Sequence, residues 1–510
     1  MTALPVRPHQ ILQPGRRTLH PDQLEQAAGP VEVVIDAATR GRMEACQQML
    51  HASLRKGRAV YGATTGFGPL VGFPGREDTA DQCENVLAHL TAGQGPDLDP
   101  AIVRAAMLAR LWSLARGHSG VAPAVADHLA AALGTTFAPA VPRLGSLGAS
   151  GDLIPLAYLV SSLRGHGQAY LEVERLPAAR ALEKAGLTAL PLDGRDALAL
   201  VNGTSVTAAA AGLAIAALDR SRVVALLLSA LLADILGAAP AFLSSALLEA
   251  FGHPDAAAVG AELRGRLAGL RPCLARPLQE SYSVRCTPQL LGAARSAISY
   301  AGMTVRDDLN GVSDNPLLFP DHDEIAHGGN FFGQPVAFAA DLLSLAATQL
   351  GNLAERQLDL LVDPHRNGGL PPMLSADPGR QHALQGVQLA ATAIVADMRR
   401  HATPASIQSL PTNLHNQDVI PFGTQAALNA LNQARSLRLL HGSLAVALRQ
   451  AVHVGERAPT APSCARLLDT LADVVAPITH DRPLDRDVRA AADLLDRAAD
   501  EHRQASAEPR

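Results

Sequence analysis

Long apolar stretches rich in alanine and leucine recur along the chain from residue 206 onward. Each has the length of a helix and contains few β-branched or aromatic residues. Helices that are apolar on most sides pack in the interior of a bundle, where alanine lets neighbouring backbones approach closely. We therefore predict four core helices of one long bundle, over Val206–Leu218, Val223–Leu243, Val336–Leu350 and Leu384–Met398.

The second of these stretches also resembles a membrane span. Val223–Leu243 is almost wholly apolar, but Asp234 lies in its middle and Pro240 near its end. A carboxylate at the centre of a bilayer costs about 2.5–3.5 kcal/mol. Most of the other stretches are too short to cross a bilayer, which takes about 20 residues. We therefore expect core helices and no membrane partner.

Strand signals are few. Val31–Ile35 alternates weakly, and Ala169–Val173 is typical of one arm of a short hairpin. Apolar residues recur at helical spacing over Asp485–Arg503, which predicts an amphipathic terminal helix. Glycine and proline concentrate in the first part of the chain. The predicted fold class is mainly α, with a loop-rich, mainly helical N-terminal domain over residues 1–205 and a long-helix bundle over residues 206–510.

Composition and charge argue against several classes of function. The 510 residues carry a net charge of −5 with 18% charged side chains, so no basic face indicates nucleic-acid binding. The five cysteines are scattered without a Cys-x-x-Cys pair, which favours reduced thiols and argues against a zinc site. Residues Met1–Gly15 contain no apolar run of the signal-peptide type. We therefore expect a cytoplasmic protein with neither nucleic acid nor a metal as a partner.

Residues Gly145–Leu156 carry the most informative chemistry. At their centre lies the tripeptide Ala149-Ser150-Gly151. In a tight loop the amide nitrogen of Gly151 can reach the carbonyl carbon of Ala149, because glycine has no side chain to block the approach. Loss of two waters, one of them from the Ser150 hydroxyl, would leave a methylidene group on an imidazolone ring. That group is an electrophile, which ordinary side chains do not provide.

The same stretch allows two other interpretations. The first is an ordinary glycine-rich turn, since glycines such as Gly145, Gly148 and Gly151 are common in loops. A Gly-x-Ser-x-Gly hydrolase elbow requires glycine where the chain has Asp152, so the spacing excludes it. Partners for an electrophile elsewhere in the chain would distinguish a reactive group from a plain turn.

With its flanking Gly148 and Asp152-Leu153, the tripeptide resembles the signature of the aromatic amino acid ammonia-lyases. These enzymes build a 4-methylidene-imidazol-5-one (MIO) group from their own backbone and use no external cofactor. The resemblance implies an ammonia-lyase/fumarase-like fold and an MIO group formed from Ala149, Ser150 and Gly151.

A second stretch, Tyr61–Leu70, is similar to the family's Tyr-Gly-x-x-Thr-Gly-Phe-Gly segment, whose tyrosine is the catalytic base. Its glycines are not spaced as in a Gly-x-Gly-x-x-Gly nucleotide loop, and Pro69 removes an amide donor. Many relatives have asparagine where this chain has Thr64. The resemblance implies that Tyr61 is the base.

Five more stretches resemble family elements in chain order. They are Ala199–Thr204, Gln279–Cys286, Asp314–Pro316, His327–Phe331 and Asn413–Asp418. The resemblance implies that Asn202 and Tyr282 are catalytic and that Arg285 binds the substrate carboxylate. It also assigns further residues to substrate binding, namely Gln279, Asn315, Phe331, Asn416 and Gln417. Any one of these residues alone would be explained by a turn, a cap or a solvated charge.

The chemistry of ammonia elimination needs these residue types. Ammonia leaves readily only when its nitrogen is made electron-poor, which covalent attack on an electrophile achieves. The β-proton is weakly acidic, so a strong base must lie beside it, and a tyrosinate suits this task if its pKa of about 10 is lowered by its surroundings. A guanidinium holds a carboxylate through two parallel hydrogen bonds. Asparagine amides and backbone N–H groups can stabilise charge on the imidazolone oxygen.

Residues Asn85–Leu90 align with the helix that sets substrate selectivity in this family. The resemblance implies His-Leu in tyrosine enzymes, as in His89-Leu90, against Phe-Leu in phenylalanine enzymes and Ser-His in histidine enzymes. His89 would then bind a phenolic hydroxyl, and a substrate without that hydroxyl leaves a buried polar group unpaired at a cost of about 1–3 kcal/mol. A histidine on an apolar helix is otherwise a core residue.

Two further positions bear on the substrate. Histidine enzymes carry a glutamate where this chain has Gln417, and a neutral amide suits an aryl substrate better. Ala383–Gly386 departs from the Ser-Gly-Phe/Leu-Met type of sequence, so that Gln385 alters either the pocket or only the packing.

We therefore expect an ammonia-lyase that converts L-tyrosine to p-coumarate and ammonia. Phenylalanine or histidine as substrate, and a tyrosine 2,3-aminomutase that re-adds ammonia at the β-carbon, are alternatives. A binding protein with a decayed site is another, against which the retention of Tyr61, Ser150, Asn202, Tyr282 and Arg285 argues. The resemblance further implies a homotetramer whose active sites combine residues from three subunits.

Overall fold

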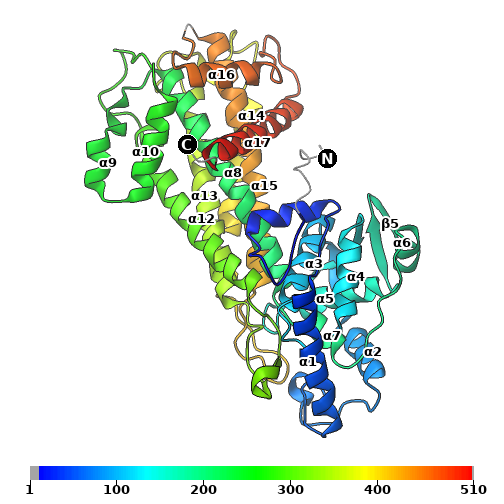
Figure 1. Cartoon of the computed structure of the whole chain (residues 1–510). Coiled ribbons are helices and arrows are strands. Elements are labelled where there is room, and N and C mark those ends of the chain that lie inside the picture. Colours follow the sequence, from blue (N-terminus) through cyan, green and yellow to red (C-terminus); the bar gives the residue numbers. More distant parts are fainter. Residues whose placement is uncertain (1–10, 456, 508–510) are drawn as a thin grey trace. The chain divides into compact units, whose positions relative to one another are not determined.

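In the computed structural model, which describes residues 11–455 and 457–507, the chain forms two compact units (Figure 1). Unit 1 consists of Met1–Ala216, Ala301–Asp341 and Pro404–Leu428, and unit 2 consists of Ala217–Tyr300, Leu342–Thr403 and Asn429–Arg510. The predicted mainly α fold class is confirmed, because the described residues form 17 α-helices and only short strands. The domain division at residue 205 stays a prediction.

Four long helices contribute residues to both units. They are α8 (Ser205–Leu236), α12 (Thr287–Asn310), α13 (Gln334–Val362) and α15 (Gly423–Val454). Helix α8 contains the predicted Val206–Leu218 helix and most of Val223–Leu243. It ends at Leu236 because Gly237 adopts φ 67° and Pro240 begins a separate 3-10 turn.

The carboxylate inside α8 has a structural explanation within unit 2. Asp234 is fully buried, and its carboxylate accepts hydrogen bonds from the backbone N–H groups of Thr460 at 3.0 Å and Ala461 at 2.8 Å. These two residues directly precede helix α16 (Pro462–Ala472). Asp234 therefore neutralises the free N–H groups at the start of another helix, as an acidic side chain near a helix N-terminus does.

Helix α13 is long and apolar enough to cross a membrane by length and composition alone. However, 72% of its most apolar window is buried within the chain. This degree of burial agrees with the core helix that the sequence predicts over Val336–Leu350.

Helix α14 (Gln385–His401) differs from the prediction for Leu384–Met398. It buries a single stripe made by Val387, Ala391, Val395 and Met398, whereas Leu389 is 67% exposed. The buried positions recur every three or four residues, so the expectation of a helix buried on most sides is wrong for the described chain.

Unit 1 contains three small antiparallel sheets. Their strands are β1 (Gln94–Asp97) with β3 (Pro142–Leu144), β2 (Phe137–Pro139) with β4 (Gln168–Leu171) and β5 (Glu174–Pro177), and β6 (Leu317–Phe319) with β7 (Glu324–Ala326). The hairpin predicted around Ala169–Val173 is confirmed by the β4–β5 pair. The weak strand signal at Val31–Ile35 is wrong, because only Val33 forms an isolated bridge there.

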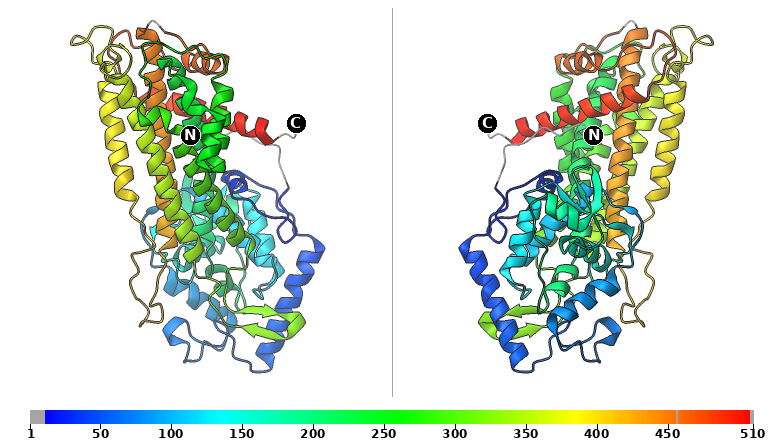
Figure 2. Two further views of the ribbon diagram at one scale, coloured as in Figure 1. Left: turned by 90° about the vertical axis from the view of Figure 1, so that its left-hand side faces the viewer. Right: turned by 90° about the vertical axis from the view of Figure 1, so that its right-hand side faces the viewer.

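The remaining helices of unit 1 surround these sheets. They are α1 (Ala37–Arg55), α2 (Thr79–Leu90), α3 (Pro100–Leu114), α4 (Pro123–Leu133), α5 (Leu153–Leu163), α6 (Ala178–Lys184) and α7 (Asp196–Val201), with 3-10 turns at Pro21–Ala28, Gly68–Leu70 and Pro320–His322. Helix α2 begins where the Asp78 carboxylate accepts from the Asp81 N–H at 2.8 Å, which caps its first turn. The β6–β7 hairpin lies beside α1 (Figure 2).

Unit 2 is helical. Besides parts of the long helices it contains α9 (Ser245–Phe251), α10 (Pro254–Arg266), α11 (Tyr282–Arg285), α14, α16 and α17 (Asp485–Ala507), with 3-10 turns at Pro240–Leu243 and Pro372–Leu374. The predicted amphipathic terminal helix is confirmed by α17, which buries Ala491, Leu494 and Leu495 on one face. Figure 1 shows α9 and α10 side by side.

Candidate active site

The Ala149-Ser150-Gly151 loop connects β3 to α5 and is fixed at both ends. Gly148 and Gly151 adopt φ values of 65° and 66°, which side chains other than glycine rarely allow. The Gly148 carbonyl accepts from the Gly333 N–H at 3.0 Å, and the Gly203 carbonyl accepts from the Asp152 N–H at 2.7 Å. The loop therefore keeps its tight conformation through glycine and backbone hydrogen bonds.

Asp152 anchors the end of this loop. Its fully buried carboxylate accepts from the N–H groups of Val206 and Thr207, each at 2.8 Å, at the start of α8. Three hydroxyls complete its hydrogen bonding, those of Ser146, Thr207 and Thr424, each at 2.7 Å. A buried charge is tolerated when it is this well hydrogen-bonded. Asp152 thus ties the loop to the starts of both α8 and α15.

Gly151 of the loop packs directly against Gly203. A Cβ added to Gly151 would overlap the backbone of Gly203, and a Cβ added to Gly203 would overlap the guanidinium of Arg110 and lie 2.5 Å from the Ser313 carbonyl oxygen. The Arg110 side chain is fully buried and donates to the Ser313 carbonyl at 2.8 Å. Burial lowers the Arg110 pKa to about 10. The floor of the loop is therefore rigid, and only glycine fits at either position.

The Ser150 hydroxyl lies against Gln417. The Gln417 side-chain amide donates to Ser150 Oγ at 2.7 Å. Gln417 itself is held by an antiparallel bridge with Thr412, closed by backbone hydrogen bonds of 3.0 and 3.3 Å. Residues 267 positions apart in the sequence are thus in direct contact, and both belong to unit 1.

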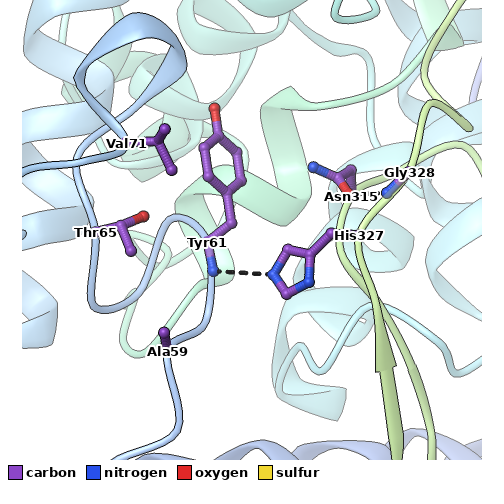
Figure 3. A pocket seen from close by; sticks show the side chains of 7 residues that line it. All are labelled: Ala59, Tyr61, Thr65, Val71, Asn315, His327 and Gly328. Atoms are coloured by element: carbon purple, nitrogen blue, oxygen red, sulfur yellow. Dashed lines mark hydrogen bonds between the residues drawn. The ribbon is translucent and has the colours of Figure 1, made fainter.

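Tyr61 lines a cavity of about 550 Å³ in unit 1, together with Ala59, Thr65, Val71, Asn315, His327 and Gly328 (Figure 3). Its hydroxyl accepts from the Gly68 N–H at 2.9 Å, and its backbone N–H donates to His327 Nε2 at 3.5 Å. Burial raises the pKa of the Tyr61 phenol, although the Gly68 donor opposes the shift. The lowered pKa that a tyrosinate base requires is therefore not produced by the described residues of this chain.

Asn202 and Asn315 lie together in unit 1. The Asn202 side-chain amide donates to the Asn315 carbonyl at 3.1 Å, and Asn315 Oδ1 accepts from the Gly328 N–H at 2.8 Å. A buried ion pair supports them, in which Arg195 binds both carboxylate oxygens of Asp314 at 2.9 and 3.0 Å. The buried Oδ1 of Asn202 has no hydrogen-bond partner among the described residues.

His89 and Tyr61 are linked by one aromatic ring. Phe67 stacks on His89 with centroids 5.7 Å apart, and its ring meets that of Tyr61 edge to face at 6.2 Å. His89 Nδ1 lies 2.8 Å from the Asn85 carbonyl oxygen, one helical turn earlier in α2. His89 is exposed and Leu90 is half-buried in the described chain.

The other predicted residues lie at the surface or are partly buried. In unit 1, Phe331 is half-buried and Asn416 is exposed. In unit 2, Gln279 is exposed and Tyr282 is 72% exposed. The Arg285 Cζ atom lies over the Tyr282 ring, 4.7 Å from its centroid. The buried Nε of Arg285 has no partner among the described residues.

Unit 1 therefore brings together most of the predicted residues around the loop and the cavity. The sequence did not single out the hydroxyls of Ser146, Thr207 and Thr424, and no local signal distinguishes them from ordinary polar residues in helices and loops. His327 begins the stretch His327–Phe331, which resembles a family element, and it lies beside Tyr61.

The residues around the loop fit an MIO group formed from Ala149, Ser150 and Gly151. Ring closure requires the Gly151 nitrogen to approach the Ala149 carbonyl, and residue 151 has the positive φ and the close packing against Gly203 that only glycine allows. The Asn202 backbone carbonyl accepts from Arg110 at 3.5 Å, and the buried side-chain Oδ1 of Asn202 has no hydrogen-bond partner among the described residues.

Comparison with known proteins agrees with this geometry. The model of the family described as aromatic amino acid lyase matches residues 19–473. The chain belongs to the aromatic amino acid lyase family. The resemblance read from the sequence is therefore confirmed, and the chain is an enzyme of the carbon–nitrogen lyase class.

Members of this family with different substrates are similar to the chain. A tyrosine ammonia-lyase of Cereibacter sphaeroides is 38% identical over 497 residues, which cover 92% of this chain and 94% of that protein. A histidine ammonia-lyase of Symbiobacterium thermophilum is 35% identical over 486 residues, which cover 94% and 96%. A solved structure of a tyrosine aminomutase from Streptomyces globisporus has a TM-score of 0.91 and 30% identity, with 98% of each chain covered.

Proposed function

We propose that this aromatic amino acid lyase eliminates ammonia from L-tyrosine to give p-coumarate, using an MIO group formed from Ala149, Ser150 and Gly151. When formed, the group supplies an electrophile for the substrate amine. The observation that carries the choice of substrate is the orientation of His89.

The hydrogen bond of His89 Nδ1 determines that Nε2 is the ring nitrogen able to accept a hydrogen bond. A carbonyl oxygen only accepts hydrogen bonds, so the 2.8 Å contact to the Asn85 carbonyl requires a proton on Nδ1. In the neutral ring Nε2 is then unprotonated and can accept from a phenolic hydroxyl. Tyrosine offers that hydroxyl and phenylalanine does not, which supports tyrosine as the preferred substrate.

Gln417 supports an aryl substrate over histidine. Its amide lies 2.7 Å from Ser150 Oγ and so close to the reacting centre. The resemblance implies that histidine enzymes carry a glutamate at this position, whose charge can pair with an imidazole. A neutral amide offers no such pair, and this disfavours histidine as substrate.

Tyr61 is proposed to remove the β-proton. Its hydroxyl already accepts from the Gly68 N–H, a donor that favours the phenolate. Burial alone opposes deprotonation, so the base needs a positive charge beside it. The proposed homotetramer, in which active sites combine residues of three subunits, provides a way to bring one.

The remaining roles are proposed from the resemblance and the geometry together. Arg285 would bind the substrate carboxylate, because a guanidinium can donate two parallel hydrogen bonds to it. Asn202 and Tyr282 would act at the reacting centre. Substrate contacts are proposed for Leu90, Gln279, Asn315, Phe331 and Asn416. A cytoplasmic location belongs to the same proposal.

An aminomutase is the second candidate, because the similar solved structure is named a tyrosine aminomutase. It would perform the same elimination and then add ammonia back at the β-carbon.

One assay tests these proposals. Purified enzyme is incubated separately with L-tyrosine, L-phenylalanine and L-histidine, and arylacrylate absorbance, ammonia and β-amino acid are measured. The proposal predicts p-coumarate and ammonia in equal amounts with tyrosine as the best substrate. A best rate on histidine, or β-tyrosine as the main product, would contradict it.

A further inference from the structure

We propose that Gln417 promotes the loss of the Ser150 hydroxyl while the MIO group forms, and that it becomes available to the substrate only afterwards. This step rests on the proposed function, because it concerns the formation of the proposed MIO group. The contact on which it rests is made by the unreacted hydroxyl of Ser150.

The contact that carries the proposal joins the two groups directly. The Gln417 amide nitrogen lies 2.7 Å from Ser150 Oγ, within the range of a good hydrogen bond. An amide nitrogen can only donate, so the serine oxygen is the acceptor. A donor is therefore aimed at the atom that must leave.

The formation of the ring breaks and makes a defined set of bonds. The Gly151 nitrogen bonds to the Ala149 carbonyl carbon, and a C=N double bond forms between that carbon and the Ser150 nitrogen. The carbonyl oxygen leaves as the first water with the two protons that were on the Gly151 and Ser150 nitrogens. The Ser150 Cα–H and Cβ–Oγ bonds then break, a Cα=Cβ double bond forms, and the hydroxyl leaves with a proton as the second water. No oxidant or reductant is needed.

The second dehydration is where a donor helps. Hydroxide is a poor leaving group, and negative charge develops on Oγ as the Cβ–Oγ bond lengthens. A fixed N–H donor at that oxygen stabilises the charge without reorganisation. A hydrogen bond to a charged group contributes about 1.5–3 kcal/mol, or roughly ten- to a hundred-fold in rate.

The backbone around Gln417 holds the donor in place. The Thr412–Gln417 bridge closes a loop in which Asn413, Leu414 and His415 adopt φ values of 51°, 53° and 61°. Residues other than glycine rarely adopt such conformations, which persist where the surroundings impose them. Leu414 is 83% exposed, so burial of its side chain does not hold the loop. The Thr412–Gln417 hydrogen bonds close this loop, and Gln417 contacts Ser150 from it.

This contact exists only until its acceptor leaves. Once Oγ has left, the Gln417 amide loses its partner and its N–H groups are free beside the new methylidene. One side chain thus serves first in maturation and then in substrate binding.

The test follows maturation by mass, independently of activity. Full-length protein is made in a cell-free reaction, sampled over time and digested with trypsin. Cleavage after Arg143 and Arg164 releases one peptide containing Ala149–Gly151, since no Lys or Arg lies between these sites. In the order of steps given above, loss of one water marks the closed ring, and loss of two marks the completed group.

Gln417→Met removes the donor and keeps a side chain of similar length. We expect the second dehydration to be at least about tenfold slower than in the wild type, with the one-water peptide accumulating. Gln425→Met is the matched control, because Gln425 also binds this loop, donating to the Ser146 carbonyl at 2.7 Å, without touching Ser150. It should mature at the wild-type rate. Equal rates for Gln417→Met and the wild type, or equal slowing in both variants, would overturn the proposal.

Gln417→Glu provides a second readout in a side chain of the same shape. A carboxyl group can donate to Oγ only when protonated, so its second dehydration should accelerate relative to the wild type as the pH is lowered from 8 to 6. A ratio of rates independent of pH would count against a donor role. If the wild-type peptide never loses two waters, the proposed function fails. If it does and Gln417→Met matches it, only this inference fails.

Discussion

Gly203 lies directly beneath Gly151, so closely that a Cβ on Gly151 would overlap the Gly203 backbone. Behind Gly203, the buried Arg110 guanidinium and the Ser313 carbonyl leave no room for a side chain either. Gly203 thus lies between the reactive loop and Arg110, and its lack of a side chain lets the loop pack closely there.

Gly203→Ala should disturb this packing. The new methyl group would force Arg110 or the loop to move, and overpacking of this kind costs about 1–3 kcal/mol. We expect a lower melting temperature and a smaller fraction of the tryptic peptide that has lost two waters. Gly41→Ala is the control for a glycine-to-alanine change without overpacking. Gly41 lies within helix α1, and a Cβ added there meets nothing within 4 Å. Normal maturation of Gly203→Ala would show that the close packing at Gly203 is not needed for MIO formation.

Ser150→Ala should nearly abolish turnover while leaving the fold intact. Alanine cannot lose water to form the methylidene, and the change removes only one hydroxyl, the acceptor of the Gln417 hydrogen bond. Activity on tyrosine and the mass of the tryptic peptide are measured in the same preparation. Near wild-type turnover in the variant would rule out the MIO group.

Tyr61→Phe should remove elimination activity but leave substrate binding within about tenfold, because the ring stays and only the proton acceptor is lost. The edge-to-face contact with Phe67 is preserved in this variant. Arg285→Ala is the contrasting change and should weaken binding strongly, since the carboxylate loses its bidentate partner. Steady-state kinetics and a competition assay with a substrate analogue separate the two effects. The reverse pattern would contradict the assigned roles.

The motifs around Ser150 and Tyr61 could be read from the sequence because they depend on short local patterns. The contacts between distant residues that hold these motifs in place could not be predicted from the sequence. Thr207 and Thr424 meet at the Asp152 carboxylate although they are 217 positions apart, and each lies in the first turn of an unremarkable helix. The raised pKa of Tyr61 likewise depends on burial, which a loop sequence does not encode.

Of the four long helices, α8 and α13 were predicted from their uniform apolar composition, with less accurate ends, whereas α12 and α15 were not predicted. The Val206–Leu218 and Val223–Leu243 segments form the single helix α8, since Asp219 to Arg222 between them are also good enough helix formers. The one-sided burial of α14 was missed, because alanines satisfy an apolar pattern whether they are buried or not.

Asp196→Asn tests an electrostatic consequence of burial. Burial raises the Asp196 pKa from 3.8 to about 6, at the start of helix α7. Between these pH values the folded protein binds more protons at this site than the unfolded chain does. The free energy of unfolding therefore falls as the pH rises through the window, by up to about 3 kcal/mol. The Asp196→Asn variant has no titrating group at this position, so its free energy of unfolding should not show this decrease. Urea unfolding at pH 4, 5, 6 and 7 should show the wild type losing stability relative to the variant, and a constant difference would refute the shift.

His89→Phe is the most direct test of the central claim, that this lyase selects tyrosine through a hydrogen bond from its hydroxyl. A lost hydrogen bond is worth about 1 kcal/mol, and up to about 3 kcal/mol if the bound substrate buries His89, which is exposed in the described chain, and leaves it unpaired. The decisive measurement is kcat/KM for L-tyrosine and for L-phenylalanine in the wild type and in this variant. The account predicts that the wild type prefers tyrosine and that the ratio shifts towards phenylalanine by roughly ten- to a few hundred-fold. An unchanged ratio would make His89 a packing residue that stacks on Phe67 and would contradict the assignment of tyrosine as the substrate.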